Sequence, residues 1–89
     1  MKKVNLIDHT LGYLRETMSN YADEEFGRQI YKKLSNHHYK NEKEFVEELG
    51  EEETDYLDSV LEEELKYARQ AQDEKRVKEL NEVYERLPL

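Results

Sequence analysis

The sequence predicts a small all-α domain. Apolar residues recur at every third or fourth position through most of the 89-residue chain, which is the spacing of one helical face. Glycine occurs three times and proline once, so few positions interrupt a helix. Residue types that start and end helices separate the apolar stretches. We expect a single domain over residues 1–89, with two N-terminal helices and a short third helix packed on one long C-terminal helix.

The first half contains an apolar stripe that is long enough for two helices. Asp8 is a candidate N-cap for the first helix, and Ser19-Asn20 offers a second cap inside the stripe. One kinked helix over 9–35 also fits, but the internal cap favours two helices, at about 9–19 and 21–35. The stripe comprises Ile7, Leu11, Leu14, Met18, Tyr21 or Ala22, Phe26, Ile30 and Leu34.

A short third helix is predicted at about residues 42–49. Asn41 followed by Glu44 resembles the capping box that opens many helices, with Asn in place of Ser or Thr. A compact group of apolar residues follows. Gly50 suits the left-handed residue that often ends a helix.

The last predicted helix covers about residues 52–87. Its apolar stripe is interrupted by a polar stretch from Arg69 to Arg76, so either one helix shifts its apolar face or a turn lies near Gln72-Asp73. The intervening residues are good helix formers, which favours one unbroken helix. Such a helix would be roughly 50 Å long and would leave apolar surface for a second chain.

The net charge of −8 is unevenly distributed. Residues 1–40 carry seven basic and five acidic side chains, whereas residues 41–89 carry seven basic and 17 acidic ones. Most of the acidic excess lies between Glu42 and Glu64. The two halves either present separate solvated faces, which we expect, or fold onto each other with complementary charges.

The composition excludes several classes of protein. The chain has no cysteine, so it can form neither a disulfide framework nor a thiolate site. No apolar run is long enough for a membrane span or a signal peptide, and we expect a cytoplasmic protein without membrane contact. No phosphate-binding loop or nucleophile motif is present, so we expect neither catalysis nor a cofactor.

A metal site is not expected either. His37-His38 is the most obvious pair of ligands, with Glu42 and Glu44 nearby. Adjacent histidines point in different directions, and transition metals in proteins take three or four converging ligands. The pair is more typical of a polar surface loop.

Seven tyrosines are distributed along the chain, mostly beside the apolar stripes. They either line the margins of a thin core, which we favour, or form an aromatic rim that binds a partner, because tyrosine is common in protein interfaces. The candidates for such a rim are Tyr13, Tyr31, Tyr67 and Tyr84.

Three segments resemble a known family when taken together. These are Thr10-Leu11-Gly12-Tyr13-Leu14-Arg15-Glu16, Glu44-Phe45-Val46, and the tail from Lys66-Tyr67-Ala68-Arg69 to Asn81-Glu82-Val83-Tyr84. In this order they resemble the small sigma-G-dependent, sporulation-specific acid-soluble spore protein of spore-forming bacilli, over about residues 9–87. The resemblance implies synthesis in the forespore and residence inside the spore. It brings no catalytic or binding residues with it.

The residues and the resemblance together predict a non-enzymatic spore protein that acts by contact with an unknown protein partner. A homodimer with paired long helices is one form that this contact would take. The alternative is a storage or filler protein that is degraded for amino acids at germination. Binding to nucleic acid is not expected, because it would require the basic group Arg28, Lys32, Lys33 and Lys40 to outweigh the acidic half.

Overall fold

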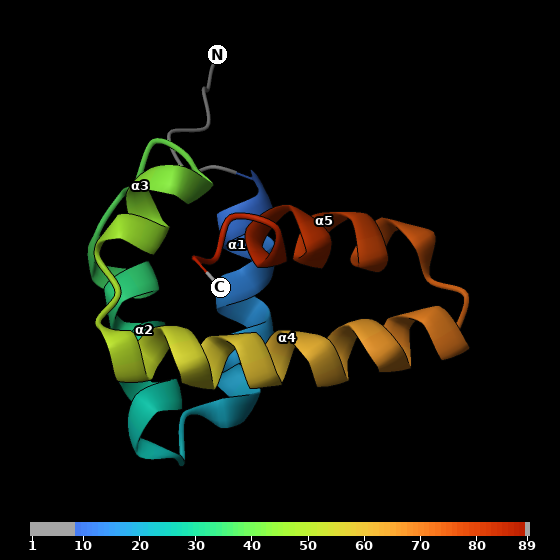
Figure 1. The fold of residues 1–89 in the computed structure, drawn as a ribbon, viewed down its shortest axis with the longest axis horizontal. Coiled ribbons are helices and arrows are strands. Elements are labelled where there is room, and N and C mark those ends of the chain that lie inside the picture. The colour runs from blue at the N-terminus through green and yellow to red at the C-terminus, as the bar shows by residue number, and fades with distance from the viewer. Residues whose placement is uncertain (1–8, 89) are drawn as a thin grey trace.

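The computed structural model describes residues 9–88, and in this part of the chain every regular element is a helix (Figure 1). The predicted all-α class is therefore confirmed. The elements are α1 (His9–Met18), the 3₁₀ helix η1 (Ser19–Tyr21), α2 (Glu25–Asn36), α3 (Glu42–Glu47), α4 (Glu51–Gln70) and α5 (Glu74–Tyr84).

The joint between the first two helices lies where it was predicted, but it is longer. After α1 the chain makes the 3₁₀ turn η1, and α2 begins at Glu25 rather than at residue 21. Ser19 donates its hydroxyl hydrogen bond backwards to the Glu16 carbonyl, at 2.6 Å, so it serves the end of α1 and does not cap α2. The N-cap predicted at Asp8 lies outside the described residues.

Helix α2 packs very closely against η1, and a glycine makes this possible. A Cβ atom built on Gly27 would lie 2.1 Å from the carbonyl oxygen of Tyr21, which is far inside van der Waals contact. Gly27 is buried within α2, where glycine is otherwise a poor helix residue. The glycine therefore allows the backbones of η1 and α2 to touch.

The predicted cap of α3 is confirmed, whereas the predicted role of Gly50 is wrong. The Asn41 side chain accepts a hydrogen bond from the Glu44 N–H at 2.9 Å, as expected for an N-cap. Helix α3 already ends at Glu47, in a tight turn of 3₁₀-type hydrogen bonds. Gly50 has φ −77° and ψ 172°, which is extended backbone, and it is the N-cap of α4.

The unbroken helix predicted over residues 52–87 is wrong. Helices α4 and α5 are separate and form an antiparallel hairpin, while α1 crosses behind it (Figure 1). The molecule is 37 Å along its longest axis, too short for the roughly 50 Å of the predicted helix. The two halves of the apolar stripe are buried together in one core, and this packing outweighs the good helix propensity of the residues between them.

The reversal depends on a left-handed residue that is not glycine. Gln72 has φ +57°, and its N–H donates to the Arg69 carbonyl at 3.1 Å. The N–H of Asp73 donates to the Ala68 carbonyl at 2.9 Å, and these two hydrogen bonds together form a Schellman motif. The carboxylate of Asp73 then caps α5 by accepting the Arg76 N–H at 3.1 Å.

Replacement of this residue by glycine is expected to stabilise the protein. Gln72→Gly removes a steric cost of about 1–2 kcal/mol for a left-handed L-residue, but loses about 0.5–1 kcal/mol in chain entropy. We expect the free energy of unfolding to rise by about 0.5–1 kcal/mol in urea denaturation. Gln72→Val, which adds a branched side chain at the same φ, should lower it. A lower urea midpoint for the glycine variant would contradict this account of the turn.

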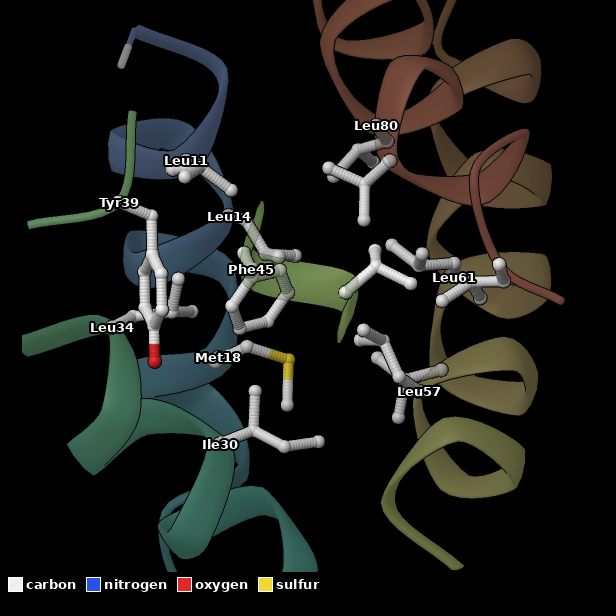
Figure 2. Close-up of a cluster of buried hydrophobic side chains, with 14 of the residues drawn as sticks. Leu11, Leu14, Met18, Ile30, Leu34, Tyr39, Phe45, Leu57, Leu61 and Leu80 are labelled. Atoms are coloured by element: carbon white, nitrogen blue, oxygen red, sulfur yellow. The ribbon is translucent and has the colours of Figure 1, made fainter. Parts of the chain in front are cut away.

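The core lies where all the helices meet, and Phe45 of α3 is at its centre. Figure 2 shows its ring among side chains of α1 and α2 on one side and leucines of α4 on the other. Phe45 is fully buried, and Tyr39 packs its ring edge-on against it with the centroids 5.5 Å apart. Tyr39 belongs to the irregular segment before α3, which carries no apolar period, yet only 7% of its surface is exposed.

Candidate interaction surface

The four tyrosines predicted as a rim lie on four different helices. Tyr13, Tyr31 and Tyr84 are half-buried and pack against the core. Tyr67, near the end of α4, is 55% exposed, and it is the one large hydrophobic residue that is exposed among the described residues. The structure therefore leaves Tyr67 as the most accessible of the four.

Tyr13 belongs to a polar cluster that also contains Tyr21, Glu64 and Arg76. The Arg76 guanidinium lies 5.9 Å from the centroid of the Tyr13 ring and donates to the Glu64 carboxylate at 2.5 Å. The Tyr21 hydroxyl donates to the other oxygen of the same carboxylate at 2.6 Å. This polar cluster joins α1, η1, α4 and α5, so its first role is to hold the helices together.

Other tyrosines also donate to glutamates of different elements. The Tyr84 hydroxyl of α5 donates to Glu62 of α4 at 3.1 Å, and the Tyr56 hydroxyl of α4 donates to Glu24, the N-cap of α2. The acidic excess of the chain thus supplies acceptors for tyrosine hydroxyls at the margin of the core. A tyrosine hydroxyl is neutral, so it donates to a carboxylate without adding positive charge to the chain.

Burial and the hydrogen bond to Glu64 keep the Tyr21 hydroxyl protonated in the folded state, so the stability of the fold should depend on pH in the alkaline range. Burial raises the pKa of Tyr21 well above its ordinary value, and the Glu64 carboxylate raises it further. The unfolded chain loses this proton near pH 10, so above pH 10 the folded state binds more protons and stability falls as pH rises.

We therefore expect the melting temperature to decrease steeply above pH 10, and to decrease less steeply in Tyr21→Phe. Thermal unfolding followed by circular dichroism between pH 8 and about pH 11 measures both slopes. Tyr31→Phe, on a half-buried tyrosine outside the polar cluster, is the matched control. Equal slopes for Tyr21→Phe and the wild type would show that this hydroxyl is not held protonated by the fold.

An ion pair joins the two differently charged halves of the chain. The Lys33 ammonium of α2 lies 2.6 Å from the carboxylate of Glu53, and it also donates to the Glu48 carbonyl at 2.8 Å. Glu53 is buried and also accepts the N–H of Gly50, which caps the start of α4. Within the described residues, the remaining basic side chains of the predicted group form no ion pair and are exposed. They are Arg28, Lys32 and Lys40.

Acidic and basic side chains also lie at opposite ends of the α4–α5 hairpin, which the sequence did not predict. The first turns of α4 expose Glu51, Glu52 and Asp55. Residues 66–78, at the other end of the hairpin, contain five basic and two acidic side chains. Counting charge by halves of the chain hid this basic end, because it falls in the same half as the acidic residues between Glu42 and Glu64.

The histidines do not form a metal centre in the described part of the chain. His37 and His38 are exposed, and the His37 ring lies 5.7 Å from the Tyr39 ring. Within residues 9–88 no group of three or more potential ligands lies close enough to hold a metal ion. The same residues contain no helix that is both long and apolar enough to cross a membrane.

Comparison with known proteins gives two matches. The family described as CsgA, minor curli fiber component A, matches residues 7–88. A protein of Bacillus subtilis (strain 168), named sigma-G-dependent sporulation-specific SASP protein, is 53% identical over 81 residues, which cover 91% of this chain and 99% of the relative. No solved structure shows a significant match.

Proposed function

The chain belongs to the family of sigma-G-dependent, sporulation-specific acid-soluble spore proteins, and we propose that it acts in the spore interior by binding other proteins, without catalysing a reaction. The 53% identity extends over nearly the whole length of both chains, which supports a role in the spore. The name of the relative names no reaction.

The matched family description names a fibre component, and the relative is named for sporulation. These names point to different functions, and a helical fold alone does not choose between them. The relative's name comes with a high identity along the full chain, so it carries the proposal. The three sequence segments that resemble the spore protein family lie on α1, α3 and the α4–α5 hairpin, which are the main parts of the fold.

One observation carries the proposal of protein binding: the exposure of Tyr67. Tyr21, Tyr56 and Tyr84 use their hydroxyls in bonds between elements, and their rings pack against the core. Tyr67 has 55% of its surface exposed and packs against no other described ring. An exposed tyrosine on a rigid helix is typical of a contact that is buried only when a partner binds.

A photo-cross-linking amino acid at position 67 tests this proposal. The substituted protein is produced in sporulating cells, irradiated, and recovered from purified spores. We expect a covalent adduct of higher mass that contains one recurrent protein. The same group at position 32, an exposed site on α2, is the control for non-specific capture. An adduct of equal yield at both positions, or none at position 67, would contradict the proposal.

Storage of amino acids is less well supported by the structure. A storage chain needs no ordered core, whereas this chain buries Phe45 fully and joins its helices through the polar cluster. An ordered core restricts which residues each buried position accepts, whereas a reservoir of amino acids needs no such restriction. Binding to nucleic acid also stays disfavoured, because Lys33 pairs with Glu53 and only part of the basic group remains exposed.

A further inference from the structure

The hairpin places opposite charges at its two ends. Glu51 and Glu52 are exposed at the start of α4, and Lys66, Lys75 and Lys78 are exposed around the hairpin tip. Helix α4 has 20 residues, so the two ends are about 30 Å apart. The basic tip of one molecule therefore cannot reach its own acidic end, and pairing between the two requires a second copy.

A groove lies beside the acidic end, and its lining includes the aromatic residue Phe26. It has a volume of about 570 Å³, and it runs between α2 and the start of α4. Phe26 is half-buried there, with its ring 6.1 Å from that of Tyr56. The carboxylate of Glu53 is engaged by Lys33, but Glu51 and Glu52 form no ion pair within residues 9–88. The groove is lined by Phe26, Gln29, Gly50, Glu51, Glu52 and Glu53.

Gly50 is one of the residues that line this groove, and its backbone conformation does not require glycine. Its φ of −77° is accessible to any residue, and a Cβ at this position would meet only the Glu53 carboxylate, at 3.7 Å. A Ser or Asp would also cap α4 better than glycine does, because its side chain would accept a hydrogen bond from the first turn. The missing side chain leaves the backbone of this N-cap exposed.

The basic end carries exposed lysines that a second copy of the chain can approach. The tip of the hairpin extends away from the other helices (Figure 1). Lys66, Lys75 and Lys78 are exposed and form no ion pair among the described residues. A lysine that enters the groove would meet the carboxylates of Glu51 and Glu52, which attract a cation.

We propose that the chain self-associates head to tail: the hairpin tip of one copy, residues 66–78, docks in the groove between α2 and α4 of the next copy. This inference rests on the proposed function of protein contact and names a second copy of the chain as one partner. It replaces the pairing of long helices, because the predicted long helix is divided into α4 and α5. The contact joins two different surfaces, so it leads to short chains or rings rather than only to dimers. Since exposed ion pairs carry it, salt should weaken it.

Sedimentation velocity of the purified full chain tests the inference. At about 20 mM ionic strength we expect the weight-average sedimentation coefficient to rise with protein concentration up to about 0.5 mM, and at about 500 mM ionic strength we expect no rise. A coefficient that stays at the monomer value throughout the low-salt series would overturn the inference.

Neutralising each surface separately makes the test specific. The tip variant is Lys75→Gln with Lys78→Gln, and the groove variant is Glu51→Gln with Glu52→Gln. Each variant alone should remain monomeric at low salt. An equimolar mixture should form species of two copies and nothing larger, because each variant keeps only one of the two surfaces.

Two control variants keep the same net charges with both surfaces intact. Lys32→Gln with Lys40→Gln matches the tip variant, and Glu16→Gln with Glu47→Gln matches the groove variant. Both should associate like the wild type. Equal loss of association in variants and controls would show a general effect of net charge and overturn the inference. Position 67 lies within the tip, so the identity of its cross-linked partner separates the two proposals: a monomeric protein that still cross-links to a different protein would leave the proposed function in place.

Discussion

Replacement of Phe45 by alanine should lower the free energy of unfolding by about 3–5 kcal/mol, the range for a buried phenylalanine whose removal leaves a cavity. Phe45 is fully buried at the meeting point of the helices, and Tyr39 packs against its ring (Figure 2). A domain of this size is stable by about 5–13 kcal/mol, so the variant would lose a large part of its stability. Urea denaturation followed by circular dichroism gives the difference directly.

Phe26→Ala is the matched control for this prediction. Phe26 is half-buried on α2 and contacts the Tyr56 ring at the surface. Its removal exposes less apolar area and leaves no closed cavity, so we expect a loss of only about 1–2 kcal/mol. If the two alanine variants lost the same stability, Phe45 would not occupy the centre of the core.

A second large effect is expected from Gly27→Ala. In an exposed helix this change would stabilise by about 0.5–1 kcal/mol, because alanine is the better helix former. Here the new methyl group would lie 2.1 Å from the Tyr21 carbonyl oxygen, which belongs to the backbone and cannot rotate away. Helix α2 would have to move off η1, and we expect a loss of about 3 kcal/mol or more.

Gly12→Ala, the same replacement in α1, should change the free energy of unfolding in the opposite direction. Gly12 lies within α1, and a Cβ at this position meets no atom within 4 Å. Alanine should therefore raise the free energy of unfolding by about 0.5–1 kcal/mol. The two variants differ in sign, and helix propensity alone predicts the same sign for both. A stabilising Gly27→Ala would show that α2 and η1 are not in direct backbone contact.

The sequence predicted the local features of the fold well, because the signals for them are local. The apolar stripe of the first half marks α1 and α2, and Asn41 marks the start of α3 through a hydrogen bond to a residue three positions away. The turn at Gln72 carries no such signal. It is stabilised by the burial of leucines from both sides of it, which outweighs the cost of its left-handed backbone.

The interaction surface was less predictable than the helices. The sequence singled out Tyr67 only as one of four candidates. Its exposure depends on which tyrosines pack against the core and bond to glutamates of other helices. Tyr21 and Glu64 are 43 positions apart, and Tyr84 and Glu62 are 22 apart, so no spacing rule connects them. The acidic groove likewise arises only when α2 packs beside the start of α4, and the basic tip only when α4 and α5 fold into a hairpin.

The contact between α1 and α5 has a consequence for how the protein is made. The Thr10 hydroxyl donates to the buried carboxylate of Glu79, 69 positions later, at 2.8 Å, and α1 packs on α5. A chain emerging from the ribosome presents α1 first, whereas α5, on which α1 packs, is synthesised almost last. Helix α1 can pack on α2 early, but the part of the core that Leu80 and Val83 complete stays open until they have been added. The domain can therefore close only when its synthesis is nearly complete.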